Sequence, residues 1–590
     1  MYKRAVDNIP YTGDTICQFG GFNNTDMIQE NEFEDMMNMS SDRYPYICTR
    51  AHRQESNSYG YPEDIAEIKW VYALPAGPSI AESYKNGLLL GVRTNISGND
   101  DTLYDDIAQV FVRPYPRPPI NVGNLPGKVA TVGANIVFWD AKEIYNTDNH
   151  TWTKMEERIS RSLVRFQFLP QSNLYVDIEV VVQSESKPDW EFAPGIWYEV
   201  TGLEIDENGN TPPENKRRFV IDEVKKKWTS SSNNTWIYAG RMNWAATTDR
   251  ETYLASKNQN MGVRVEAPYP DLSGICSSNN RLWGWAGKEL YASKLGDPAE
   301  FWAYEGISTD SYAVTAGDCG KIKACIGYRN TVLFFTATTI IRVSGTQPSN
   351  FSVQEIHCNG LDGDSRSIAI LHDKLYYKSF DAIMMYDGYT PIEISSPIDG
   401  EQYDAAYLGT HGEKLFAFLT PRGSNNMILF SYDTKRNIWE KEEEFTKDNV
   451  KSMATSERTL FVSIHDEYQD RDVLWSPSSR NCTDAFSLPP EGAFDWYVQT
   501  GDLLLYSLDR KYLQKVKVRI ELDDGATAEI YASIDGSEFK QIGRMAKPGQ
   551  HTYLFPVTMS QCDSLKLKIS GHGDATIMGI QKIWGEGNDV

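Results

Sequence analysis

A short apolar pattern that recurs along most of the chain constrains its fold more than any other feature. Each copy has a polar or charged residue, one free position, and then Leu or Val followed by large apolar residues. The seven copies start at Asn86, Asn135, Asn280, Asn330, Asp373, Glu413 and Arg458. Most steps between them are about 40 to 50 residues, which is the period of four-stranded propeller blades. The sequence therefore predicts an all-β propeller of about seven blades, within a range of six to eight.

The stretch from Asn280 to Ser308 is the clearest single unit, with two tightly paired strands, a polar turn and a Trp-bearing outer strand. A second mark supports the register, because residues 145–152 and 432–439 share a Tyr, a Thr two residues on and a Trp seven residues on. A four-stranded blade cannot bury both faces alone, and radial packing of blades covers them. The alternative is an irregular β-sandwich whose hairpins repeat by chance.

One step of the repeat is about 100 residues too long, which indicates an insertion. We expect residues 61–156 to form the first blades, residues 157–270 an inserted domain, and residues 271–485 the remaining blades. Alternating strands at 174–182 and 195–201, with a turn at Asn208-Gly209, predict a small barrel-like β module in the insertion.

The two ends of the chain differ from the repeat. Residues 495–590 alternate cleanly and carry hairpin turns, so they predict a C-terminal antiparallel sandwich of about eight strands, jelly-roll-like. Residues 1–60 predict an extended and helical assembly segment. Within it, apolar residues between Asp26 and Met39 have the spacing of a short amphipathic helix.

Composition narrows the function classes. The net charge is −23 and the pI is about 4.9, which weighs against a surface that tracks nucleic-acid phosphates. Eight scattered cysteines with no CxxC pair indicate reduced, mostly buried thiols. The start of the chain has no apolar run typical of a secretory signal, and no stretch is long and apolar enough to span a membrane.

Three patterns resemble ligand sites, but the first two lack required residues and the third has a simpler interpretation. Gly317 to Lys321 resembles a phosphate loop, yet Ile322 stands where a metal-binding Ser or Thr is needed. The turn that starts at Asp206 lacks the glycine spacing and the final Glu of a calcium loop. The acidic turn at Asp362-Gly-Asp364 could bind a cation through two carboxylates, but a tight turn between blades is the preferred interpretation. We therefore expect no cofactor and no metal.

Propeller glycosidases and sialidases are the main enzymatic alternative, since they place paired carboxylates and aromatic walls around a central channel. This chain has many acidic and aromatic residues, but it lacks the repeated Asp-box of that class. The nearest approach, Ser533 to Phe539, has the wrong spacing and lies outside the predicted propeller.

Several blocks of the sequence together resemble a known family. They are the Gly-Gly and Asn23 of the first segment, a polar stretch ending in Asn38, Ser-Asp-x-Tyr-Pro at 41–45, and Arg50, followed by residues 280–283, 291–298, 308–313 and 348–351. This order is similar to that of propeller proteins in the virions and prophages of tailed bacteriophages, including tail nozzle and hub components of short-tailed phages. The resemblance covers most of the chain.

The resemblance implies a structural, non-enzymatic virion protein that is assembled in the host cytoplasm. It implies a homo-oligomeric ring at the tail, with a hexamer favoured, other tail proteins as partners, and passage of DNA without sequence-specific binding. The predicted interface residues, some of which would add to the sheet edge of a neighbour, are Phe19, Gly20, Gly21, Phe22, Asn23, Tyr44, Pro45 and Arg50.

Two other functions remain open on the sequence. One is a carbohydrate-binding or glycoside-cleaving propeller, such as a receptor-binding tail component. The other is a bacterial scaffold propeller unrelated to phages. Glycan binding that is lost with two channel carboxylates would favour the first.

Overall fold

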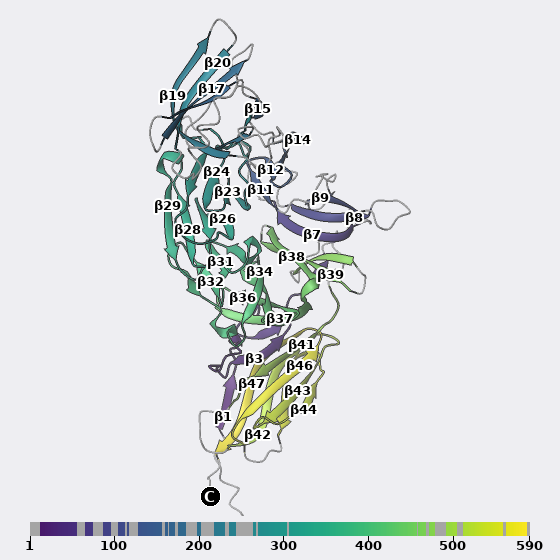
Figure 1. The fold of residues 1–590 in the computed structure, drawn as a ribbon. Coiled ribbons are helices and arrows are strands. Elements are labelled where there is room, and N and C mark those ends of the chain that lie inside the picture. The colour runs from purple at the N-terminus through teal and green to yellow at the C-terminus, as the bar shows by residue number, and fades with distance from the viewer. Residues whose placement is uncertain are drawn as a thin grey trace, which may run out of the picture. The chain divides into compact units, whose positions relative to one another are not determined.

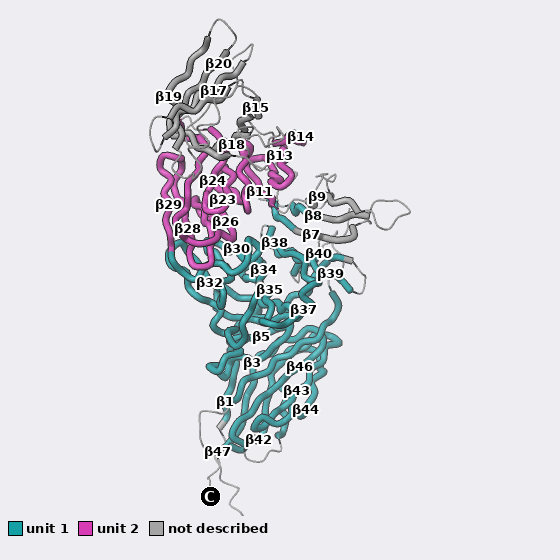
Figure 2. The backbone as a smooth tube through the Cα atoms, viewed as in Figure 1, with its two compact units in different colours: residues 1–77, 82–125, 357–590 teal, residues 78–81, 126–356 magenta. Residues whose placement is uncertain are grey.

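The structure is a computed structural model, and for the strands between residues 160 and 266 it describes the backbone alone. It describes residues 12–55, 65–74, 87–95, 104–112, 115–116, 128–155, 160–162, 165–170, 175–183, 197–201, 217–230, 235–243, 264–266, 269–303, 306–456, 458–467, 471–477, 491–503, 511–557 and 562–586. The chain forms two compact units (Figure 2): unit 1 is residues 1–77, 82–125 and 357–590, and unit 2 is residues 78–81 and 126–356.

Unit 2 contains three four-stranded antiparallel sheets and the insertion (Figure 1). The four-stranded sheets are β11 (Val129–Val132), β12 (Asn135–Phe138), β13 (Glu143–Asn146) and β14 (Thr151–Lys154); β22 (Gly274–Ser278), β23 (Arg281–Ala286), β24 (Glu289–Ala292) and β25 (Tyr312–Thr315); and β26 (Ala324–Tyr328), β27 (Thr331–Phe335), β28 (Thr339–Ser344) and β29 (Ser352–His357).

Unit 1 contains four more four-stranded sheets. They are β7 (Ile65–Ala73), β8 (Leu88–Asn95), β9 (Tyr104–Val112) and β10 (Tyr115–Pro116); β30 (Ile368–Leu371), β31 (Lys374–Lys378), β32 (Ile383–Tyr386) and β33 (Ile392–Glu393); β34 (Tyr403–His411), β35 (Lys414–Pro421), β36 (Asn426–Asp433) and β37 (Ile438–Thr446); and β38 (Val450–Ser456), β39 (Thr459–Asp466), β40 (Arg471–Pro477) and β6 (Arg53–Glu55). The predicted all-β, propeller fold class is confirmed, with seven such sheets among the described residues.

The sequence repeat marks the turn into the second strand of each blade. The turns before β23, β27 and β31 each hold a non-glycine residue with positive φ: Asn280 at 56°, Arg329 at 44° and His372 at 54°. Such left-handed residues suit the tight turns that match strand twist. The Tyr and Trp of the second mark also pair across two strands, Tyr145 with Trp152 and Tyr432 with Trp439. Both marks are local, so the sequence alone could reveal them.

The insertion differs from its prediction. Its strands form one seven-stranded antiparallel sheet, and the described strands close no barrel. The strand order is β15 (Ser160–Ser162), β21 (Arg264–Glu266), β18 (Trp197–Thr201), β19 (Arg217–Ser230), β20 (Thr235–Asn243), β17 (Tyr175–Gln183) and β16 (Arg165–Pro170). Alternating strands predict an antiparallel sheet equally well whether or not it closes, so the pattern could not decide this point.

The terminal domain is a two-sheet sandwich, as predicted, but the N-terminal segment supplies part of it. Its C-terminal strands are β41 (Asp495–Thr500), β42 (Lys511–Leu522), β43 (Thr527–Ile534), β44 (Lys540–Met545), β45 (Gly549–Pro556), β46 (Leu565–His572) and β47 (Ala575–Glu586). One sheet has the order β4-β5-β47-β42-β45 with β1 also on β47, and the other has the order β2-β3-β41-β46-β43-β44. The N-terminal strands are β1 (Thr12–Ile16), β2 (Gly21–Phe22), β3 (Glu32–Met37), β4 (Met39–Ser40) and β5 (Ile47–Thr49).

The predicted helix between Asp26 and Met39 is wrong, because this stretch contains β3 and β4. A β-bulge between Phe33 and Asp35 shifts the alternation of β3, so Phe33 and Met36 both face the core. A bulge adds one residue to one strand and turns a spacing of two into a spacing of three. That spacing is also the spacing of one helix face, which explains the error.

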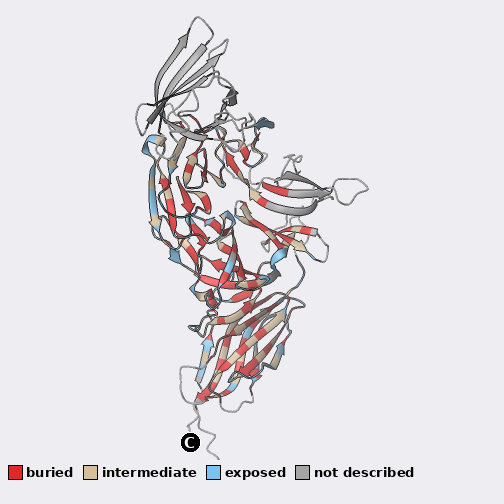
Figure 3. Ribbon diagram, viewed as in Figure 1, coloured by how far each residue is buried: buried red, intermediate tan, exposed pale blue. Residues whose placement is uncertain are grey.

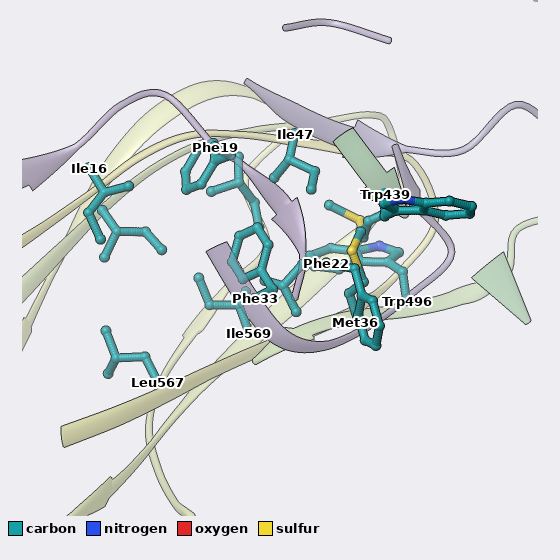
Figure 4. Close-up of a cluster of buried hydrophobic side chains, with 14 of the residues drawn as sticks. Ile16, Phe19, Phe22, Phe33, Met36, Ile47, Trp439, Trp496, Leu567 and Ile569 are labelled. Carbon is teal, nitrogen blue, oxygen red and sulfur yellow. The ribbon is translucent and has the colours of Figure 1, made fainter. Parts of the chain in front are cut away.

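Buried side chains run through both sheets of the sandwich and the adjoining blade of unit 1 (Figure 3). Phe19 stacks on Phe33 with ring centroids 5.5 Å apart, and both belong to one core cluster with Trp439 and Trp496 (Figure 4). Residues from the two ends of the chain therefore share one hydrophobic core.

The few helical segments among the residues that the structure describes are short. They are the 3-10 turns η2 (Pro348–Asn350), η3 (Ser365–Ser367), η4 (Ser396–Ile398) and η5 (Lys447–Asn449). No helix among the described residues has the length and apolar character needed to cross a membrane.

Candidate functional site

The predicted interface residues of the first segment lie mostly inside the protein. Phe19, Phe22 and Asn23 are 3%, 5% and 7% exposed. Strand β2 pairs in parallel with β3 of the same chain, at Gly21 with Glu32 and at Phe22 with Phe33. The expectation that Phe19 to Asn23 would add to the sheet edge of a neighbour is therefore corrected: these residues complete the chain's own sandwich.

The second glycine of the Gly-Gly pair is required by close packing. Gly21 has φ of +84°, a conformation that side chains with a Cβ rarely adopt. A Cβ at this position would also overlap the carbonyl oxygen of Trp439 and the side chain of Ile438. At Gly20 the nearest obstacle is the flexible side chain of Glu32, 2.7 Å from the point that a Cβ would occupy. The motif thus lets the first segment lie directly against β37.

Asn38 links the blade to the sandwich. Its backbone N–H donates to the carbonyl of Glu442 on β37 at 2.8 Å, and its Nδ2 donates to the carbonyl of Asp495 on β41 at 2.9 Å. Its Oδ1 accepts from Arg50 Nε at 2.7 Å. With φ of 57°, the residue adopts the left-handed conformation that Asn tolerates best after Gly. Asn38 thereby satisfies polar groups from three segments at once.

Arg50 and Arg53 anchor the end of the first segment. Arg50 is 4% exposed, forms an ion pair with Glu491, and places its guanidinium 4.2 Å from the ring centre of Phe494. Arg53 pairs with Glu443 and lies 3.4 Å from Glu442. Buried arginines need partners of this kind, since an unpaired buried charge is costly. Of the predicted set, Tyr44 is half-buried and Pro45 is exposed.

Lys414 is enclosed by oxygen atoms from the blade and the first segment. Its Nζ lies 2.8 Å from Glu440 Oε2, 2.9 Å from Asp42 Oδ1 and 2.8 Å from Ser40 Oγ. Burial acts to lower the pKa of Lys414, but the two carboxylates outweigh it and hold the pKa above its ordinary value. The two carboxylates therefore favour the charged form of Lys414.

The pKa values of two neighbouring carboxyl groups shift in opposite directions. Burial acts to raise the pKa of Asp42, but Lys414 outweighs it and lowers that pKa. Burial raises the pKa of Glu442, even though the Arg53 and Arg50 guanidiniums act to lower it.

A pocket of about 430 Å³ lies between the turn of the first segment and the hairpin ends of β34–β37, and its lining includes Asp42, Arg50, Arg53, Lys414 and Glu442. We call the set Gly21, Asn38, Arg50, Arg53, Lys414 and Glu440 the joint, because it connects the first segment, the blade and the sandwich within unit 1. Its cations are paired with carboxylates of the chain itself. The arrangement serves to hold three segments in register.

Sequence reasoning found Gly21, Asn38 and Arg50 through the family resemblance. It missed Arg53, Lys414 and Glu440, because single charged residues in strands carry no local mark of burial. Within the described ranges, no group of three or more His, Cys, Asp or Glu residues is placed to hold a metal ion. The insertion motif at Asp206 lies outside the described residues.

Comparison with known proteins gives weak likenesses only. No family model matches the chain, and no curated protein matches it. An exo-β-1,3-galactanase from Phanerochaete chrysosporium is similar at 10% identity and a TM-score of 0.20, over 51% of this chain and 92% of that one. Dipeptidyl peptidase 4 from Porphyromonas gingivalis is similar at 11% identity and a TM-score of 0.24, over 78% of this chain and 64% of that one.

The expectation of a non-enzymatic protein is corrected by this comparison, because the galactanase and the dipeptidyl peptidase named above are enzymes. Likeness at such TM-scores transfers neither of their activities to this chain.

Proposed function

We propose that the chain is a structural component of the tail of a tailed bacteriophage, where it forms a ring at the nozzle, hub or connector side. The observation that carries this proposal is the joint. Gly21, Asn38 and Arg50, which belong to the family-like first segment, each contact the blade, the sandwich or one another in this structure. The residues that carry the resemblance therefore also hold the first segment in place, which supports the proposal.

A rigid body suits a ring subunit. The first segment supplies strands to the sandwich and also β6, the fourth strand of the blade β38–β40. Pulling either end of the chain out would break a sheet, so the parts of unit 1 resist separation under load. In a ring, the large negative charge of the chain would repel DNA phosphates and keep passing DNA from adhering.

The test is to locate the chain in particles. A tag placed after Val590 would be imaged on intact virions, with the mass of the purified protein measured beside it. We expect the label at one fixed point of the tail in a ring-like copy number. Particles without label, from a host that expresses the tagged chain as the only copy, would refute the proposal.

One observation favours carbohydrate binding as a second candidate. It is a groove with two half-buried tyrosines, Tyr497 and Tyr531, on the outer face of the sandwich, and not a feature of the blades.

A further inference from the structure

The outer face of one sandwich sheet is hollowed into a groove of about 550 Å³. This volume is in the range of small-ligand sites, which is about 300–1,000 Å³. The groove lies over β3, β41, β46 and β43, which Figure 1 shows side by side with β44 in the sandwich. Its side chains include Asp495, Tyr497, Glu529, Tyr531, Lys568 and His572.

Strand alternation places these side chains outside. Trp496 and Val498 are 1% exposed and face the core, so Tyr497 between them faces out. The register pairs Tyr497 with Ser570, and Lys568 with Tyr531. The two tyrosines therefore flank β46 from opposite sides and are offset by two residues. From strand spacings of ~4.8 Å and a rise of ~3.4 Å per residue, their Cα atoms are about 12 Å apart.

Hydrogen bonds fix the orientation of both rings. Tyr531 donates from its hydroxyl to Glu529 Oε2 at 2.6 Å, and Tyr497 donates to Asp35 Oδ2 at 2.8 Å. The ammonium of Lys568 lies 4.4 Å from the ring centre of Tyr497. The groove thus holds carboxylate acceptors and an ammonium donor beside the two rings.

The floor of the groove excludes a peptide strand as the main occupant. Strands β41, β46 and β43 are each paired on both sides, so their backbone N–H and carbonyl groups are used within the sheet. A peptide that binds by strand addition needs a free sheet edge. An occupant of this face has to be recognised by side chains alone.

The charges exclude a strongly anionic occupant. Asp495 and Glu529 bring two carboxylates to the groove, against the single ammonium of Lys568. His572 is already hydrogen-bonded to Asp495 at 2.8 Å. The remaining chemistry is a neutral chain with many hydroxyl groups and apolar ring faces.

We propose that this groove binds a neutral oligosaccharide. Sugar rings would stack on the tyrosine rings, while their hydroxyls exchange hydrogen bonds with Glu529, Lys568 and Asp495. No member of the joint lines this groove, although the carbonyl of Asp495 accepts from Asn38. The inference does not depend on a place in a virion.

The test is binding of the full-length chain to an array of neutral oligosaccharides, acidic oligosaccharides and peptides. Titration calorimetry then follows with the strongest neutral oligosaccharide. We expect Tyr531→Ala to weaken binding about tenfold, as loss of one aromatic contact does. Tyr531→Phe keeps the ring and should lose less. Tyr389→Ala is the matched control, since Tyr389 is 80% exposed on a blade far from this sheet in sequence.

Thermal unfolding of each variant shows that a loss of binding is not a loss of fold. The proposal is overturned if no neutral oligosaccharide binds, if peptides or acidic glycans bind instead, or if Tyr531→Ala and Tyr389→Ala behave alike. The tail-labelling experiment and the binding experiment are independent. Failure of either one would not change the result expected from the other.

Discussion

At the scale of single residues, the joint shows how a few positions decide where a whole segment lies. Gly21 permits contact with β37, Asn38 bridges blade and sandwich, and Arg50 closes the segment with an ion pair. Gly21 contributes to the packing of the segment through its geometry, Asn38 through its hydrogen bonds and Arg50 through its charge.

Gly21→Ala should destabilise the protein beyond the cost of its backbone conformation. Gly525 has the same φ of +84° with nothing near a Cβ, so Gly525→Ala measures the backbone cost alone. We expect Gly21→Ala to lower the free energy of unfolding by roughly 2–4 kcal/mol, which includes strain and overpacking. Denaturant unfolding of both variants checks this. Equal losses would show that the contact with Trp439 does not restrict this site.

Glu491 should contribute to acid sensitivity. Burial acts to raise the pKa of Glu491, but the hydrogen bond and charge of Arg50 outweigh it and lower that pKa below 4.5. The unfolded chain then takes up this proton first as the pH falls. Stability from Glu491 is therefore present above about pH 4.5 and is lost as the pH falls through the lower folded value.

Glu491→Gln should be less stable at neutral pH, by roughly 2 kcal/mol, because Arg50 loses its charged partner. Between about pH 5 and about pH 3 it should lose less stability than the unmodified chain. Melting temperatures across this interval provide the measurement, and Glu538→Gln at an exposed position is the control. Parallel pH curves for all three proteins would argue against the Arg50 pair.

At the scale of elements, the main result is that strands from the first segment complete sheets whose other strands lie at the far end of the sequence. Strand β3 pairs with β41, β5 pairs with β47, and β6 pairs with β40. The first segment is thus part of the folded core of unit 1.

Phe33→Ala tests this. Phe33 is 1% exposed and stacks on Phe19, so its truncation should cost about 3–5 kcal/mol of unfolding free energy. Met27 lies in the same segment but is 81% exposed, and Met27→Ala should change little. Denaturant unfolding followed by tryptophan fluorescence reports the core that holds Trp496. A Phe33→Ala variant as stable as Met27→Ala would mean that the segment is detachable.

At the scale of the whole molecule, charge should govern self-association. A net charge of −23 opposes close approach of identical chains. The proposed ring should therefore form more readily as salt rises from ~0.01 M to ~1 M, where the Debye length falls from about 30 Å to about 3 Å. Mass measurement of the purified chain across this range would show it. A single mass at every salt concentration would argue that a partner, and not charge, controls assembly.

The sequence by itself determined the blades and the C-terminal strands, because their hairpins depend on turns and alternation between near neighbours. The positive-φ residues before β23, β27 and β31 form turns between strands that are adjacent in sequence. Tyr432 and Trp439, which pair across two strands, are also only seven residues apart. Only the tertiary structure decided what the first segment pairs with. Its partners lie hundreds of residues away, and a bulge at Phe33 gave β3 the spacing of a helix. Burial of Lys414 and the alignment of Tyr497 with Tyr531 likewise arise when distant strands meet, since no local pattern encodes a partner.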